Sequence, residues 1–272
     1  MSVSSTTANV TTTLVLGGTG NTGRRLIEQL LLAQNQNVRA IVRSKERFHE
    51  IIPANNPRLK VIEGVVLEMQ DAEFEDAVTG CDAVVSCLGH NMDFKGIFGK
   101  PRQLVTDSIK RVCKTIEKNH DASVTSASSG THKPAPTKVL LMGSNGVANP
   151  NGMDDIRPWK ERALLSCIRF AIPPHKDNEM AAAFLSKDVG VDDGNDNGTT
   201  KGAIEWVVVR PDDLIEGDVS EYTVYEKPQA GLFGGGQTTR ANVAHFMKDL
   251  ITNTDTWKKW VYQMPVPTNI PA

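Results

Sequence analysis

The sequence predicts an α/β fold, a doubly wound parallel sheet with helices on both faces. Three observations support this prediction. Short apolar runs alternate along the chain with segments of helical periodicity, and a glycine-rich turn follows the first of these runs. The length of 272 residues lies within the range of a single α/β domain. Alternating strands and helices form right-handed βαβ units, which align the strands in parallel.

The apolar runs have the length and composition of buried strands. In chain order they span residues 12–18, 37–43, 58–66, 81–89, 138–144 and 204–211. Helical spacing of apolar residues lies between them, at 24–33, 72–78 and 102–118. A further helix is expected at 173–185, where Pro173 and Pro174 suit the first turn. These elements account for one continuous sheet.

Two polar segments interrupt this alternation. Residues 121–137 are rich in Ser, Thr and Pro, and residues 188–202 are rich in Gly, Asp and Asn. Neither composition can bury a core, so both are expected to be surface insertions within one domain. We therefore expect a flexible tail at 1–11 and a single domain at 12–272, with a small C-terminal elaboration on the substrate side.

Composition narrows the possible partners and compartments. The net charge of −2 gives no reason to expect nucleic acid or an anionic membrane as a partner. Cysteines 81, 87, 113 and 167 form no CxxC pair, which predicts a reduced, cytoplasmic protein without a metal site. No apolar stretch approaches the roughly 20 residues that span a bilayer. Residues 1–13 lack Arg, Lys and an apolar core, so a cleaved targeting peptide is poorly supported.

The glycine-rich turn carries the clearest functional signal. Gly17, Gly20 and Gly23 are spaced by threes, after a predicted strand and at the start of a predicted helix. In that context glycines let the backbone approach a pyrophosphate, and the helix N-terminus supplies free N–H groups. Further side-chain donors in the same turn are Thr19, Asn21 and Thr22. The alternative is a turn with a structural role alone.

The end of the second predicted strand indicates which dinucleotide binds. NAD-binding folds usually place an acidic residue there to bind the ribose 2′-hydroxyl. This chain instead places Arg43 there, followed by Ser44, Lys45 and Arg47. A guanidinium can hold a 2′-phosphate with two hydrogen bonds, so NADP(H) is favoured over NAD(H). The alternative is that 43–47 is only the solvated start of a basic helix.

These motifs resemble the atypical short-chain dehydrogenase/reductase superfamily, in particular its NmrA-like regulators and flavin/biliverdin-IXβ reductases. The resemblance rests on GGTGNTGR at 17–24, the arginine after the second strand, DAVVSCLG at 82–89 and VVVRP at 207–211. It implies a Rossmann-type domain whose cofactor is contacted by Leu88 and Gly89 on the adenosine-ribose and pyrophosphate side. It also implies that Ser144, Arg210 and Pro211 approach the nicotinamide. His90 can be a cofactor contact or a residue at the rim.

The superfamily's usual catalytic pair is missing. Ordinary members use Tyr-x-x-x-Lys, but Tyr222, Tyr225 and Tyr262 are followed four residues later by Glu, Gln and Val. Oxidoreduction or epimerisation through a tyrosinate is therefore not supported. The proton therefore has to come from another residue of the chain or, with an electrophilic acceptor, from solvent.

The helix expected at 173–185 offers two candidate donors. His175 and Lys176 fall in its first turn and could protonate a substrate after hydride transfer, with His the natural choice near neutral pH. The alternative is a solvent-facing first turn in which Asp177 serves the dipole of its own helix. Ser144, at a strand end, is the third candidate; its alternative role is a hydrogen bond to cofactor or backbone.

Two loops could complete a substrate pocket. Residues 90–101 mix aromatic, glycine and polar side chains and could close over the nicotinamide ring. Residues 226–247 contain a glycine-rich stretch before a helix that Thr239 or Asn242 could cap. Both loops are expected at the edge of the sheet where the cofactor binds.

Two functions of different classes fit these features. The first is an NADPH-dependent reductase that passes hydride to a small planar or carbonyl acceptor such as a flavin, tetrapyrrole or quinone. The second is a non-catalytic NADP(H) sensor of the NmrA type, which the missing Tyr-x-x-x-Lys pair favours. A sugar-nucleotide epimerase ranks last, because it needs the tyrosine and a larger C-terminal domain. The sequence leaves the substrate and the oligomeric state open.

Overall fold

The computed structural model describes most of the chain. Described residues are 10–90, 101–126, 134–155, 159–161, 164, 173–191, 202–229, 234 and 236–270. Among them, no helix is long and apolar enough to cross a membrane. The loop expected at 90–101 lies almost entirely outside the described residues, as do Cys167 and much of the segment 226–236.

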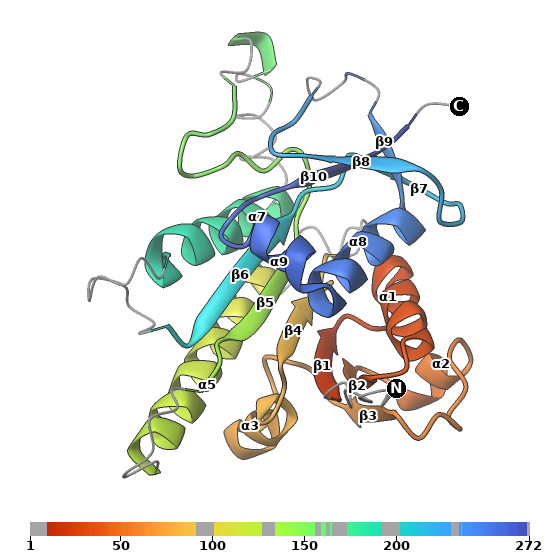
Figure 1. The fold of residues 1–272 in the computed structure, drawn as a ribbon, viewed down its shortest axis with the longest axis vertical. Helices are drawn as coiled ribbons and strands as arrows, with labels where there is room; N and C mark the ends of the chain where they lie inside the picture. Colours follow the sequence, from red (N-terminus) through yellow and green to blue (C-terminus); the bar gives the residue numbers. More distant parts are fainter. Residues whose placement is uncertain are drawn as a thin grey trace, which may run out of the picture.

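A six-stranded parallel sheet forms the centre of the molecule (Figure 1). Its order is β3-β2-β1-β4-β5-β6, so the chain starts in the middle, winds outward through β2 and β3, and returns to the other side of β1. This is the predicted doubly wound arrangement, with its switch point between β1 and β4. The strands are β1 (Thr11–Leu16), β2 (Gln36–Val42), β3 (Leu59–Glu63), β4 (Ala83–Ser86), β5 (Thr137–Met142) and β6 (Ile204–Val209).

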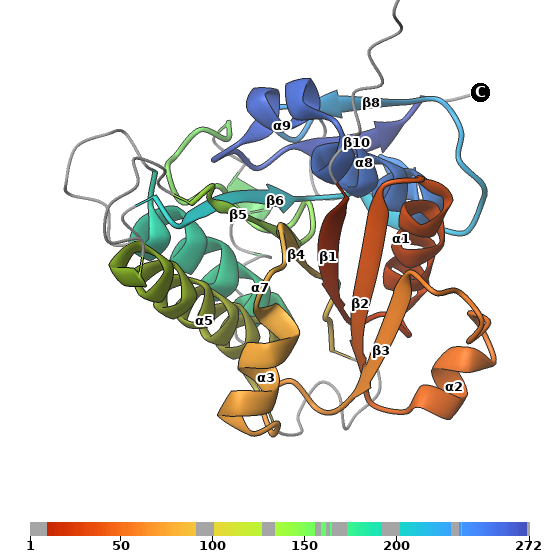
Figure 2. The ribbon, with the colours of Figure 1, turned by 60° about the horizontal axis from the view of Figure 1, so that its bottom comes forward.

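Successive side chains of β1 point to opposite faces of the sheet, and both faces are covered. Leu14 and Leu16 belong to one hydrophobic cluster and Val15 to the other, and all three are fully buried. One face carries α3 (Asp71–Val78), α5 (Leu104–Ser126) and α7 (Pro173–Ala183). The opposite face carries α1 (Asn21–Leu32), α2 (Lys45–His49), α8 (Arg240–Thr252) and α9 (Thr254–Trp260), as Figure 2 shows. Such two-sided burial is typical of parallel sheets.

Register brings the carboxyl ends of the central strands together. Leu16, the last residue of β1, pairs with Ile41 of β2 and with Ser86 of β4. The segments that follow these strands therefore emerge side by side at one edge of the sheet. That edge is where ligands bind in open α/β sheets.

The C-terminal part adds two small sheets that the sequence did not predict. β7 (Asp213–Ile215) pairs in parallel with β9 (Gln237–Thr239), and β8 (Tyr222–Tyr225) pairs antiparallel with β10 (Val266–Asn269). Thr239 caps α8, since its side chain accepts a hydrogen bond from the N–H of Asn242. The predicted cap at Thr239 is thus confirmed, and Asn242 is its donor, not an alternative cap.

Two predicted helices end differently from expectation. α5 runs through Ser126, six residues into the expected insertion at 121–137. In its polar last turns the hydroxyls of Ser123 and Thr125 bond to carbonyls four residues back, at 2.8 and 2.7 Å. α7 ends at Ala183 and continues as a π-helical turn, Phe184–Val189, into the second expected insertion. Residues 127–133 and 192–201 of these segments lie outside the described residues.

Candidate functional site

The glycine-rich turn is closed by backbone contacts that exclude side chains. Gly17 has φ of 80°, and a Cβ there would lie 2.7 Å from the carbonyl oxygen of Cys87, at the end of β4. A Cβ on Gly23 would overlap the carbonyl oxygen of Gly17. The N–H of Gly20 donates to the same oxygen at 3.0 Å. Glycine is therefore required at 17 and 23 for the turn to pack against β4.

The turn leaves the N-terminus of α1 available to an anion. The first backbone bond of the helix runs from Arg24 N to Gly20 O, so the N–H groups of residues 21–23 precede it. Gly20, in the cap position, supplies no side-chain cap. Gly20 and Asn21 are exposed, whereas Thr22 and Gly23 are buried. Free N–H groups and the helix dipole at an accessible end fit a pyrophosphate.

Arg43 lies directly after β2, at the same edge of the sheet. Its side chain is exposed, and no ion pair or hydrogen bond of this guanidinium occurs within the described part of the chain. Ser44 caps α2 by accepting from Arg47 N at 3.3 Å. Arg43 and Arg47 therefore lie on either side of the cap residue Ser44, and both side chains are exposed.

The segment after β4 approaches the glycine turn from the other side. Leu88 is half-buried and Gly89 is exposed, with open space around the position of a Cβ at Gly89. The thiol of Cys87 is enclosed, and burial raises its pKa to about 12. It therefore stays protonated at neutral pH and cannot serve as a nucleophile.

The side chain of His90 turns away from solvent toward Asp177. Its Nε2 lies 2.8 Å from Oδ2 of Asp177, and the His90 side chain is only 6% exposed. It is thus not a rim residue. Asp177 is also buried, and it accepts hydrogen bonds from the N–H groups of Val105 and Thr106 at 2.8 and 2.9 Å. Because this carboxylate accepts all three bonds, Nε2 is the nitrogen of His90 that carries the proton.

One alternative for the first turn of α7 was that it faces solvent and that Asp177 serves the dipole of its own helix. For Asp177 this is wrong, because its side chain is buried and contacts another helix. Its carboxylate caps α5 instead, and its carbonyl accepts the hydroxyl of Thr106 at 2.9 Å. Sequence reasoning missed this role because the contact joins residues 71 positions apart.

Ser144 and His175 both lie beside Gly146. A Cβ built on Gly146 would lie 3.0 Å from Cε1 of His175, 3.6 Å from its Nδ1 and 3.6 Å from Oγ of Ser144. A side chain at position 146 would thus press on the His175 ring and contact the Ser144 hydroxyl. Nε2 of His175 lies 3.4 Å from the Glu179 carboxylate, one turn further along α7. Lys176 points to solvent and is not part of this group.

Arg210 does not line the site with its side chain. The guanidinium is fully buried and makes four hydrogen bonds, to Met264 O, to Val147 O and two to the carboxylate of Asp154. The sequence-based expectation that this side chain approaches the cofactor does not fit these contacts. Pro211 is buried beside it, and its carbonyl accepts the N–H of Asn145 at 2.9 Å. The pair anchors the segments after β5 and β6.

The contacts of Tyr222 within the described residues do not suit a replacement for the missing catalytic tyrosine. Its hydroxyl is hydrogen-bonded to Nδ1 of His245 at 2.9 Å, on α8. Burial raises the pKa of this phenol, with the nearby Asp249 carboxylate adding to the shift. A tyrosinate at this position is therefore disfavoured.

Curated relatives with oxidoreductase names match part of the chain. Oxidoreductase claK of Passalora fulva is 31% identical over 147 residues, which cover 53% of this chain and 50% of that protein. Oxidoreductase ptaF of Pestalotiopsis fici is 27% identical over 157 residues, 56% of this chain and 52% of that protein. The chain thus spans about half the length of these relatives.

Solved structures share the fold at low sequence identity. A short-chain dehydrogenase/reductase from Veillonella parvula in complex with NADP has a TM-score of 0.64 at 15% identity, with 96% of this chain and 95% of that one covered. ChuY, an anaerobilin reductase from Escherichia coli O157:H7, has a TM-score of 0.61 at 16% identity, with 96% and 100% covered. The resemblance to atypical short-chain reductases therefore holds at the level of fold.

The sequence profile of a family described as NAD(P)H-binding matches residues 17–164. The match begins at Gly17 of the turn and includes the segments after β2, β4 and β5 that surround the edge of the sheet. It covers more than half of the chain. On this evidence the protein belongs to the NAD(P)H-binding family.

Proposed function

We propose that the protein is an NADPH-dependent reductase that transfers hydride to a small planar or carbonyl acceptor such as a flavin, a tetrapyrrole or a quinone. The observation that carries this proposal is that Ser144 and His175 both lie beside Gly146, at the sheet edge that also holds the glycine turn. The oxidoreductase names of the partial relatives agree with it.

Each part of the cofactor has residues that fit it. The N-terminus of α1, with Thr19 and Thr22 beside it, would take the pyrophosphate. Leu88, Gly89 and His90 would lie along the ribose and pyrophosphate, and Pro211 beside the nicotinamide. Bound NADPH would supply the hydride. Arg43 would hold the 2′-phosphate, because an exposed guanidinium after β2 attracts a dianion where an acid would repel it.

Ser144 and His175 would act on the acceptor. The Ser144 hydroxyl would donate a hydrogen bond to the oxygen or nitrogen that gains charge as hydride arrives. His175, whose Nε2 lies beside the Glu179 carboxylate, would donate the proton. This pair would replace the missing tyrosine and lysine.

Single substitutions test the catalytic assignment. Ser144→Ala and His175→Gln are each expected to lower kcat about a hundredfold, the low end for general acid catalysis. Lys176→Ala is expected to leave kcat near the starting value, because its side chain points to solvent. The assay is NADPH oxidation with flavin, quinone and aldehyde acceptors. Full activity in both Ser144→Ala and His175→Gln would remove the catalytic proposal.

The cofactor preference has its own experiment. Arg43→Ala is expected to weaken NADPH binding at least tenfold, about 1.4 kcal/mol, while NADH binding stays unchanged. Lys114→Ala, which removes an exposed charge from α5, serves as the control. Equal affinity for NADH and NADPH in the parent protein, unaltered by Arg43→Ala, would contradict the assignment.

The missing Tyr-x-x-x-Lys pair favours a second candidate function, that of a non-catalytic NADP(H) sensor of the NmrA type. Tight NADP⁺ binding without turnover of any acceptor in the panel would favour this function. Turnover that depends on Ser144 and His175 would exclude it.

A further inference from the structure

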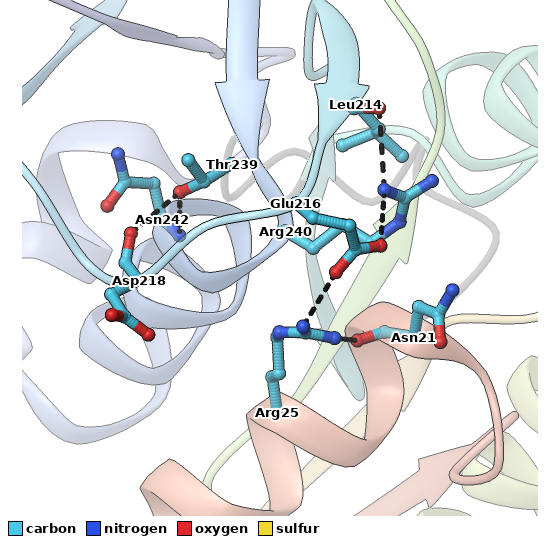
Figure 3. A network of polar contacts seen from close by, with 8 residues as sticks. All are labelled: Asn21, Arg25, Leu214, Glu216, Asp218, Thr239, Arg240 and Asn242. Atoms are coloured by element: carbon cyan, nitrogen blue, oxygen red, sulfur yellow. Dashed lines mark hydrogen bonds and ion pairs between the residues drawn. The ribbon is translucent and has the colours of Figure 1, made fainter.

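Two arginines from different helices converge on one carboxylate beside the glycine turn (Figure 3). Oε2 of Glu216, just after β7, lies 2.7 Å from Nη2 of Arg25 in α1. Oε1 of the same residue lies 2.9 Å from Nη1 of Arg240, the first residue of α8. The three side chains carry two formal positive charges and one negative charge. The cluster therefore keeps a net positive charge with Glu216 in place.

The arginines are the fixed members of this cluster. Nη1 of Arg25 donates to Asn21 O at 2.7 Å, and Nη1 of Arg240 lies 3.4 Å from Leu214 O. Their side chains are only 20% and 24% exposed, whereas Glu216 is 58% exposed. Within the described residues, the Glu216 carboxylate has contacts only to these two arginines. Its departure would thus leave both guanidinium groups anchored and facing the space it occupied.

The position of the cluster points to the acceptor, not to the adenosine end of the cofactor. Asn21, which holds Arg25, is the first residue of the helix whose N-terminus fits the pyrophosphate. Glu216 and Arg240 belong to the chain after β6, the part expected on the substrate side, whereas Arg43 follows β2. A ligand group bound here would therefore lie beside α1 and these substrate-side segments, not on the turn that carries Arg43.

We propose that Arg25 and Arg240 form a binding site for a carboxylate of the hydride acceptor, which Glu216 occupies when no acceptor is bound. Guanidinium groups are matched to carboxylates in geometry and hydrogen bonding, and the site already holds one. The acceptor's carboxylate would replace a solvent-facing internal carboxylate, so no anchored element has to move. This inference rests on the proposed reductase function, of which it names the substrate class.

Succinate is the probe for binding, measured by calorimetry with and without saturating NADP⁺. Glu216→Gln should raise succinate affinity about tenfold, because it removes the internal competitor and one negative charge. Arg240→Gln should abolish the binding. Glu75→Gln, which breaks an exposed ion pair with Lys118 on the other face of the sheet, should change nothing.

Equal succinate affinity in the parent protein, Glu216→Gln and Arg240→Gln would overturn the inference while leaving NADPH binding intact. Loss of succinate binding when NADP⁺ is added would also overturn it, because the site would then belong to a cofactor phosphate. If Arg240→Gln does not fold, Glu216→Gln alone still decides between these outcomes.

A kinetic arm compares benzaldehyde with 4-carboxybenzaldehyde, which differ by one carboxylate. Arg240→Gln should lower kcat/KM for 4-carboxybenzaldehyde at least tenfold relative to the parent protein, because KM rises. The kcat/KM for benzaldehyde should stay within about twofold of the parent value. Equal losses for both aldehydes would contradict a carboxylate site. Failure of NADPH to bind at all would instead contradict the proposed function, so the two failures are distinguishable.

Discussion

The imidazole of His90 and the carboxylate of Asp177, 87 positions apart in the chain, are joined by a hydrogen bond of 2.8 Å. The bond connects the segment after β4 to the first turn of α7, where His175 lies. The same carboxylate holds the N-terminus of α5. One buried side chain thus fixes three segments that surround the proposed site.

Replacing Asp177 with asparagine should destabilise the protein by about 2 to 4 kcal/mol. The amide has one acceptor oxygen, so its NH₂ group would face a backbone N–H or the proton on His90. The free energy of unfolding is measured in urea. The control is Asp76→Asn, whose exposed ion pair with Lys60 at 3.4 Å should contribute less than about 0.5 kcal/mol. Equal losses for the two variants would show that Asp177 has no special role.

A pair of substitutions at His90 separates positioning from direct contact. Glutamine places its amide nitrogen where Nε2 of His90 lies and can still donate to Asp177, whereas the shorter asparagine cannot. NADPH affinity should stay within about threefold in His90→Gln and fall about tenfold in His90→Asn, the equivalent of one net hydrogen bond. Fluorescence titration of NADPH measures both. An equal loss in the two variants would mean that the ring itself contacts the cofactor.

Gly17 offers a test of the phosphate turn with a matched control. Gly17→Ala should abolish cofactor binding, because its methyl group would lie 2.7 Å from Cys87 O and force the turn away from β4. Gly80 also has a positive φ, 72°, but a Cβ there meets nothing within 4 Å. Gly80→Ala should therefore cost about 1 to 2 kcal/mol of stability and leave binding intact. If both variants bind NADPH like the parent protein, the turn is not the phosphate site.

Features set by local chemistry could be predicted from the sequence. Three such features depend on residues close together in the chain and can therefore be predicted without the structure. They are the glycine turn, the alternation in β1 and the cap at Thr239. The proposed partners Ser144 and His175 were predicted separately, from their places at a strand end and in a first helical turn. That both lie beside Gly146 is a finding of the structure.

Features set by distant contacts could not be predicted. Arg210 looked like a cofactor contact, but its four bonds depend on where Asp154 and Met264 fold back. Glu216 has no neighbouring motif that would single it out, since its partners are 191 and 24 residues away. The expected insertion at 121–137 was wrong for its first six residues, which continue α5. For Arg210 and Glu216, tertiary contacts that no local pattern encodes decide where the side chain lies.

The buried thiol of Cys87 predicts how stability depends on pH. Burial raises its pKa to about 12, whereas a thiol in the unfolded chain titrates near about 8.5. A raised pKa in the folded state means that the contribution is complete below about pH 8.5 and is lost as pH rises toward 12. Between pH 9 and 10 the unfolded chain has released this proton and the folded protein has not, so unfolding becomes about 1.4 kcal/mol easier per pH unit.

Cys87→Ala should therefore make the fall in unfolding free energy between pH 9 and 10 shallower by about 1.4 kcal/mol per pH unit. Urea unfolding at pH 7.5, 9 and 10 gives this slope. Val85→Ala is the control, because it removes buried volume from the same strand without a titrating group and should lower stability equally at each pH. A slope in Cys87→Ala as steep as in Val85→Ala would show that the thiol ionises freely in the folded protein, and that the strand end against Gly17 is open to water.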